Sequence, residues 1–208
     1  YAAARQVTES RVRIAQERLG PEHPETIRAD FYMAVLVSES GAEDDWRSRF
    51  GDVVARATRV LGAESPVTLD IRVSYASCLV NHDRERAADV VRATYEDALR
   101  VLGETDATTL HAMNNLGIVL TDAGRSDEAV EIHRRCAELR ERIGRHSDAI
   151  ATWSNLGQSL KCSGRLAEAE HVLRHAVAGA ETKLGADHVD TLYARHNLAG
   201  VLMETSRL

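Results

Sequence analysis

The sequence predicts an all-α protein in which helical hairpins stack along one axis as an α-solenoid. Two observations lead to this fold class: a Leu-Gly dipeptide that returns at a nearly fixed interval, and an apolar pattern with helical spacing inside each interval. An interval of 41 or 42 residues is typical of arrays whose units bury their apolar faces by stacking on their neighbours. The recurring pairs are Leu19-Gly20, Leu61-Gly62, Leu102-Gly103, Ile143-Gly144 and Leu184-Gly185.

The first helix of each unit carries an apolar residue, a small residue immediately after it, and a second apolar residue three positions further. This i, i+1, i+4 spacing belongs to one face of a helix and not to a strand. The small residue indicates that another helix crosses there at close range, because a larger side chain would overpack the crossing. The sets are Met33-Ala34-Val37, Tyr75-Ala76-Leu79, Leu116-Gly117-Leu120, Leu156-Gly157-Leu160 and Leu198-Ala199-Leu202.

A turn with a glycine, at Gly41, Gly124 or Gly164, separates the first helix of a unit from the second. The second helix then runs to the next Leu-Gly pair, whose glycine suits the left-handed position after a helix end. His23-Pro24 and Ser65-Pro66 are start signals, with a capping residue before a proline at the first helical position. We therefore expect helices over residues 1–18, 24–39, 44–60, 66–81, 85–101, 106–122, 126–142, 147–162, 166–183 and 188–204.

The period divides the chain into one solenoid domain, residues 1–208, with about four complete hairpins and a half unit at each end. Residues 1–18 are predicted to be the second helix of a preceding repeat and 184–208 the first helix of a fifth. Leu198, Val201 and Leu202 are expected to leave an apolar strip exposed, which would favour self-association through uncapped ends. The complete repeats are expected at 19–60, 61–101, 102–142 and 143–183.

These residues resemble the tetratricopeptide repeat (TPR), whose first helix carries a Leu-Gly or Leu-Ala pair and whose second carries an alanine after a Gly-containing turn. The resemblance implies that the solenoid is right-handed. HEAT-type helix pairs share a period of roughly 40 residues, but the small residue and the Gly turn favour the tetratricopeptide interpretation. The matching residues are Asn115-Leu116-Gly117, Gly124 and Ala129, then Trp153, Asn155-Leu156-Gly157, Gly164 and Ala169.

The period is longer than the roughly 34 residues usual for this repeat, and this longer form is similar to the repeats of kinesin light chains. The passage that resembles them most is Leu184-Gly-Ala-Asp-His-Val-Asp-Thr-Leu192. Similar arrays occur in bacterial signalling ATPases, and arginine far outnumbers lysine, which occurs only as Lys161 and Lys183. We therefore expect a bacterial multidomain protein.

In this family the first helices line the concave face, so the resemblance implies a peptide-binding groove there. Asn115, Asn155 and Asn197 occupy one equivalent position and are predicted to form a ladder of amides, which both donate to and accept from a peptide backbone. The alternative is that these amides bond to neighbouring helices or face water. Tyr32 and Ser74 replace the asparagine in the earlier repeats, so binding is expected to centre on repeats three to five. The candidate peptide-binding residues are Asn114, Asn115, Ile118, Ser154, Asn155, Gln158, His196 and Asn197, with Gly200 in the same register.

Composition and motifs exclude several function classes. A net charge of -6 without a basic stripe argues against nucleic acid, and no apolar run approaches the roughly 18 residues of a membrane span. Cys78, Cys136 and Cys162 show no CxxC spacing, which suits a reducing compartment, and we expect a cytoplasmic protein. His171 and His175 are four residues apart but lack further ligands for a metal. Without a nucleophile, phosphate-loop or dinucleotide motif, we expect neither an enzyme nor a cofactor.

The sequence thus favours a protein–protein interaction module that binds a peptide segment or protein partner in its concave groove. We expect it to be the interaction or sensor region of a larger cytoplasmic protein. The main alternative is a structural spacer or self-association element with no external peptide ligand, and a small-molecule sensor is a third hypothesis. A spacer has no need of asparagine at a repeated groove position, which favours the first hypothesis.

Overall fold

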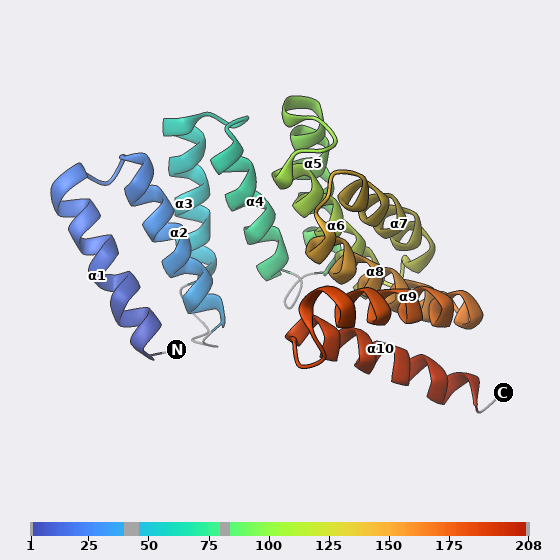
Figure 1. Cartoon of the computed structure of the whole chain (residues 1–208). Helices are drawn as coiled ribbons and strands as arrows, with labels where there is room; N and C mark the ends of the chain where they lie inside the picture. The colour runs from blue at the N-terminus through green and yellow to red at the C-terminus, as the bar shows by residue number, and fades with distance from the viewer. Residues whose placement is uncertain (1, 40–45, 80–83, 207–208) are drawn as a thin grey trace.

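The computed structural model describes residues 2–39, 46–79 and 84–206, and its regular elements there are all α-helices (Figure 1). This confirms the predicted fold class. In chain order the helices are α1 (Ala2–Leu19), α2 (Pro24–Glu39), α3 (Trp46–Leu61), α4 (Pro66–Leu79), α5 (Arg84–Leu102), α6 (Ala107–Asp122), α7 (Ser126–Arg142), α8 (His146–Cys162), α9 (Leu166–Leu184) and α10 (Val189–Thr205).

The helix ends lie within one or two residues of those predicted from the period. The expected start of the third helix at residue 44, the expected end of the fourth at 81, and the Gly41 turn fall outside the described residues. Gly62 and Gly185 follow helix ends with φ of 90° and 92°, the left-handed region that glycine enters without strain. The Leu-Gly pairs therefore do end the second helices.

Histidine caps two of the first helices at equivalent places. The Nδ1 atom of His23 accepts a hydrogen bond from the Glu25 N–H at 3.2 Å, and Nδ1 of His188 accepts one from the Asp190 N–H at 3.2 Å. Asp106 caps α6 in the same way through the Thr108 N–H. Each acceptor satisfies one of the N–H groups that a helix start leaves without a partner.

Within a hairpin, the second helix crosses the first at the predicted small residue. A Cβ atom added at Gly117 would overlap the imidazole of His133, and one added at Gly157 would overlap the side chain of Leu173. The glycines therefore make room for a side chain of the second helix and allow the two helices to approach closely.

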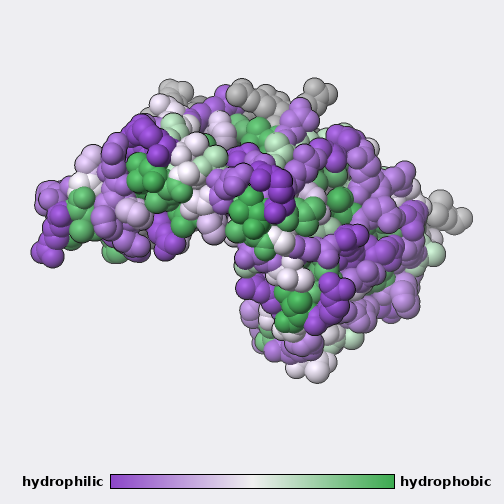
Figure 2. Space-filling view, turned by 90° about the horizontal axis from the view of Figure 1, so that it is seen from above, coloured by the Kyte–Doolittle hydropathy of each residue, from purple (hydrophilic) through white to green (hydrophobic). Residues whose placement is uncertain are grey.

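The hairpins stack so that the even-numbered helices form the inner rim of the solenoid. Each helix contacts the next one in the chain, and α2, α4, α6, α8 and α10 also contact one another in succession. Within the described ranges, no such contact joins successive odd-numbered helices. The stack therefore curves, and Figure 2 shows it as an arch with one hollowed side between its two arms.

The apolar core follows the stack as a series of connected clusters. Phe31, Trp46, Phe50 and Tyr75 form an aromatic cluster among α2, α3 and α4, with ring centroids 5.5–6.4 Å apart for the pairs that touch. Trp46 is almost fully buried at the register position where later repeats have Ala129 and Ala169.

The prediction that Leu198, Val201 and Leu202 form an exposed apolar strip on α10 is wrong. Val201 is fully buried, and Leu198 packs against the same cluster formed by α8 and α9, because this face of α10 docks on the preceding hairpin. The exposed apolar side chains of α10 lie on its opposite face, and they are Val189, Leu192, Tyr193 and Met203.

Candidate functional site

The inner rim contains a small hollow where α6, α8 and α10 come together. It has a volume of about 120 Å³ and includes three of the predicted site residues, Ile118, Asn155 and Gln158. Thr121 and Asp122 of α6, His133 of α7 and Tyr193 of α10 complete its lining. All of these residues except His133 come from three successive first helices, and we call this surface the C-terminal groove.

Two asparagines of the predicted ladder donate their amide hydrogens to the preceding first helix. Nδ2 of Asn115 donates to the Ser77 hydroxyl at 2.9 Å, and Nδ2 of Asn155 donates to Oδ1 of Asn114 at 3.2 Å. Asn197 is 8% exposed, and its Nδ2 has no hydrogen-bond partner among the described residues. Successive first helices pack closely along the inner rim. The asparagine amides on the side of one helix therefore reach the preceding first helix as well as the groove.

The remaining predicted residues differ in how they meet the solvent. Ser154 is fully buried and donates to the Ile150 carbonyl of its own helix at 3.1 Å, so its side chain does not reach the surface. Gln158 is half-buried and contacts the Cys162 sulfur at 3.6 Å, and His196 is exposed. Gly200 lies beside Lys161: a Cβ atom added at Gly200 would be 3.3 Å from Nζ of Lys161. The accessible part of the predicted site is therefore Asn114, Ile118, Asn155, Gln158 and His196.

Beneath the groove, His133 takes part in a buried polar network. Its Nε2 lies 3.2 Å from the Asn114 carbonyl oxygen and its Nδ1 lies 2.9 Å from the Ser159 hydroxyl, which is 2.7 Å from the Thr121 hydroxyl. A carbonyl oxygen can only accept, so Nε2 carries the proton and Nδ1 accepts from Ser159. Burial is the main cause that lowers the pKa of His133 to about 4; the nearby Arg140 cation acts in the same direction, and the bond to the Asn114 carbonyl opposes them. The ring is neutral at neutral pH.

The groove surface is polar and slightly acidic. Asp122 is an acidic residue of its lining, and the nearby Lys161 pairs with Glu204 at 2.9 Å. Tyr193 of α10 is 45% exposed and brings an aromatic ring with a hydroxyl group to the groove lining. The sequence analysis did not single out Tyr193. The signal available was its register position: Tyr193 lies five residues before Leu198, and His111 lies five residues before Leu116.

The histidines and cysteines of the described part of the chain do not gather at one site. Among those residues, no three His, Cys, Asp or Glu side chains gather in a way that could hold a metal ion. His175 instead packs its ring edge against Trp153, with centroids 5.7 Å apart. Cys136 is buried, which raises the pKa of its thiol, and Cys162 is exposed. Within these ranges no helix is long and apolar enough to span a membrane.

Comparison with known proteins agrees with this architecture. Residues 109–143 and residues 148–207 each match a model of the tetratricopeptide repeat. The chain is a tetratricopeptide repeat array. Its long repeats are of the kinesin-light-chain-like type: the array is 28% identical over 98 residues to the Arabidopsis thaliana protein KINESIN LIGHT CHAIN-RELATED 2 and 29% identical over 113 residues to KINESIN LIGHT CHAIN-RELATED 3. These matches cover 46% and 53% of the array but only 15% and 17% of those two proteins.

Solved structures show the same fold along nearly the whole array. BtubC (BKLC) from P. vanneervenii superposes with a TM-score of 0.78 at 16% identity, covering 99% of this chain and 82% of that one. The nearly identical TPR-like repeats of a protein assigned as a kinesin light chain from Podosopora anserina superpose with a TM-score of 0.76 at 20% identity, covering 89% of each chain. At these identities the likeness concerns the fold. Tetratricopeptide repeats are in general protein-interaction modules, and the array is a scaffold of that kind.

Proposed function

We propose that the array binds an extended peptide segment of a protein partner in the C-terminal groove. The observation that carries the proposal is the cluster of Asn155, Gln158 and Tyr193, which come from two first helices and line one hollow on the inner rim. Amide and phenol groups form hydrogen bonds with a peptide backbone of almost any sequence. An aromatic ring adds apolar contact area without the cost of ordering a long flexible side chain.

The fold leaves part of this hydrogen-bonding capacity open to a ligand. Asn155 uses one amide hydrogen on Asn114, which leaves its carbonyl oxygen and a second N–H. The Gln158 amide makes only a long contact to a sulfur atom, a weak acceptor. A peptide lying along α8 would therefore meet Gln158 and Tyr193 first, with Asn114, Ile118 and His196 of the predicted site at the margins of the groove. We further propose that this module belongs to a larger cytoplasmic protein and acts there as an interaction or sensor region.

The test selects linear peptides against the immobilised array from a random display library and measures their affinity by calorimetry. Gln158→Ala and Tyr193→Ala should each weaken binding roughly two- to tenfold, as loss of one hydrogen bond or contact predicts. Glu131→Ala is the matched control, because Glu131 is exposed on the second helix α7 away from the groove lining. Peptides whose affinity neither groove variant changes would contradict the proposed site.

Self-association is the second candidate function, and exposed apolar residues at both ends of the stack favour it. Val7 of α1 is 70% exposed and Val189 of α10 is 71% exposed, with further apolar side chains along both helices. Exposed apolar strips of this kind mark interaction surfaces. Sedimentation over a range of concentrations distinguishes the two functions: a monomer that binds selected peptides supports the groove, whereas concentration-dependent growth without peptide binding supports the alternative.

A further inference from the structure

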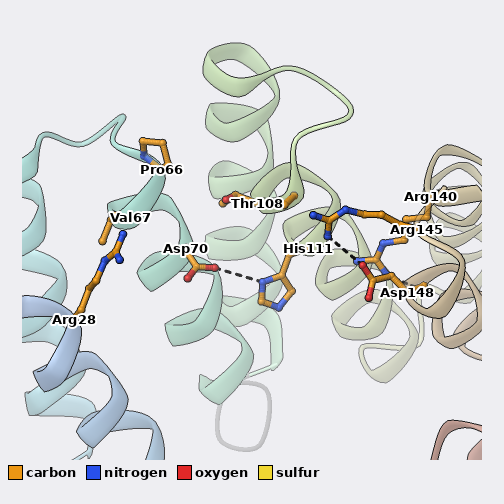
Figure 3. Close-up of a pocket in the computed structure, with 10 residues that line it drawn as sticks. Arg28, Pro66, Val67, Asp70, Thr108, His111, Arg140, Arg145 and Asp148 are labelled. Atoms are coloured by element: carbon orange, nitrogen blue, oxygen red, sulfur yellow. Dashed lines mark hydrogen bonds and ion pairs between the residues drawn. The ribbon is translucent and has the colours of Figure 1, made fainter. Parts of the chain in front are cut away.

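A second hollow on the inner rim, distinct from the C-terminal groove, contains a buried arginine. It has a volume of about 480 Å³ and lies between the N-terminal parts of α4, α6 and α8, with Arg28 of α2 at its edge. Figure 3 shows the Arg140 side chain extending from α7 toward this hollow, with Arg145 and Asp148 beside it. We call it the arginine hollow. Its charged and titratable lining residues are Arg28, Asp70, His111, Arg140, Arg145 and Asp148.

The Arg140 guanidinium is held in place by neutral groups. Nη1 donates to the Asp148 carbonyl oxygen at 3.1 Å and to the Thr152 hydroxyl at 2.5 Å, and Nη2 donates to the Leu110 carbonyl oxygen at 3.2 Å. These bonds join α7 to the starts of α6 and α8, so the side chain cannot swing out to bulk water without breaking them. The guanidinium is therefore preorganised at the wall of the hollow.

Arg140 carries a buried positive charge that no carboxylate neutralises within the described residues. Arg140 is only 9% exposed, and its Nε is buried without a hydrogen-bond acceptor. A guanidinium has five N–H groups, of which the three bonds above use three. Burial of an unpaired cation is costly, and an anion that supplied the missing acceptors would remove much of that cost.

The carboxylates that line the arginine hollow are engaged with other groups. The Asp148 carboxylate pairs with Arg145 at 3.1 Å, and the Asp70 carboxylate lies 3.6 Å from Nδ1 of His111. Arg28 has Glu25 at 3.9 Å, with both side chains half exposed. The positive charge of Arg140 therefore remains, and Arg145 beside it can turn from Asp148 toward a ligand.

We propose that the arginine hollow binds an oxyanion, a phosphate or a carboxylate, between Arg140 and Arg145. Guanidinium groups bind both kinds of anion through paired N–H···O bonds, and Arg140 keeps one N–H on Nη2 and one on Nε without a partner among the described residues. Asp148 competes with the ligand for Arg145. The proposal does not depend on peptide binding in the C-terminal groove, because a free anion is enough to test it.

The experiment titrates the array with inorganic phosphate and, separately, with acetate at pH 7 and low ionic strength, and follows the arginine Nε–H signals by NMR. The Arg140 signal should shift to saturation with at least one of the two anions. The anion that binds with the higher affinity shows whether the hollow prefers a phosphate or a carboxylate. Sodium chloride at matched ionic strength is the control for screening. A shift that does not saturate, or that chloride reproduces, overturns the proposal.

Two variants with opposite expected effects separate ligand binding from damage to the fold. Arg145→Met should weaken the anion roughly two- to fivefold, the size expected for one half-exposed charge. Asp148→Asn should tighten it by a similar factor, because it frees Arg145 and removes a negative charge. Arg174→Met, at an exposed arginine on α9, should leave the affinity unchanged. Affinities that move in the same direction in the Arg145 and Asp148 variants would contradict the site, and this pair decides the question even if Arg140→Met does not fold.

Discussion

The crossing of α2 with α3 and the crossing of α6 with α7 use the same register but different side chains. Phe50 follows Ala34 by 16 residues, as His133 follows Gly117 and Leu173 follows Gly157. All three large side chains are buried, but Phe50 joins an aromatic cluster whereas His133 joins a hydrogen-bonded one. In these three hairpins a bulky buried side chain therefore packs over a small residue, and the neighbouring side chains determine whether it is aromatic, polar or aliphatic.

The largest expected effect comes from removing the small residue. Gly117→Leu and Gly157→Leu should each destabilise the array by about 3 kcal/mol or more, because even a Cβ atom overlaps the opposing side chain and overpacking is costly. The measurement is urea denaturation followed by circular dichroism. Glu131→Leu, at an exposed position of α7, is the matched control and should be nearly neutral.

A paired substitution tests whether the overlap itself is the cause. Gly157→Ala should destabilise the parent array clearly but should cost much less in the background of Leu173→Ala, which empties the space that the new methyl group needs. Equal costs in the two backgrounds would show that the crossing does not have the proposed geometry.

Acidification should distinguish the histidine crossing from the leucine crossing. With a folded pKa of about 4 against an ordinary value of 6.5, His133 stays neutral in the folded array while the unfolded chain takes up a proton. The free energy of unfolding should therefore keep its full value above pH 6.5. It should fall by roughly 3 kcal/mol as the pH drops from 6.5 toward 4. The measurement is urea denaturation at pH 7, 5.5 and 4.

His133→Leu provides the comparison, since leucine occupies this register at residue 173. The carboxylates titrate in both proteins, so the difference between the two pH profiles isolates His133. The exposed His171→Gln variant should keep the parent profile. Parallel profiles for the parent and His133→Leu would mean that the pKa of His133 is the same in the folded and unfolded chains, so that folding does not lower it.

The smallest expected effect concerns the bridges between successive first helices. Asn115→Ala should lower the free energy of unfolding by about 0.5–1.5 kcal/mol, because it removes the hydrogen bond to Ser77. A double-mutant cycle with Ser77→Ala measures that coupling. A coupling near zero would assign the Asn115 amide to the solvent or to a ligand, as the ladder hypothesis had it.

The sequence predicted the hairpins well and the faces of the first helices less well. The Leu-Gly period and the small residue at each crossing sufficed for the helix ends and for the contact of α6 with α7, because both depend on local spacing. The angle between successive hairpins is not encoded in the period. That angle turns the flank of α6 toward α4, so that Asn115 meets Ser77, and it buries Ser154 while exposing Tyr193.

Some of what was missed left a signal in the repeat register. His133 stands where other units have Phe50 or Leu173, which already indicates that a histidine on a polar stretch of α7 is buried. The partners of Arg140 could not be found this way, because its bonds to Leu110, Asp148 and Thr152 depend on how two hairpins meet.

The contact pattern of the stack also bears on how the chain acquires its structure. In the part of the chain described, every helix contacts only helices one or two places away in the sequence. Contacts of such short range bring little loop-closure entropy, so chains of this kind fold quickly and can begin from any well-packed hairpin. A partly synthesised array could therefore order each hairpin as it emerges, without waiting for the residues that follow.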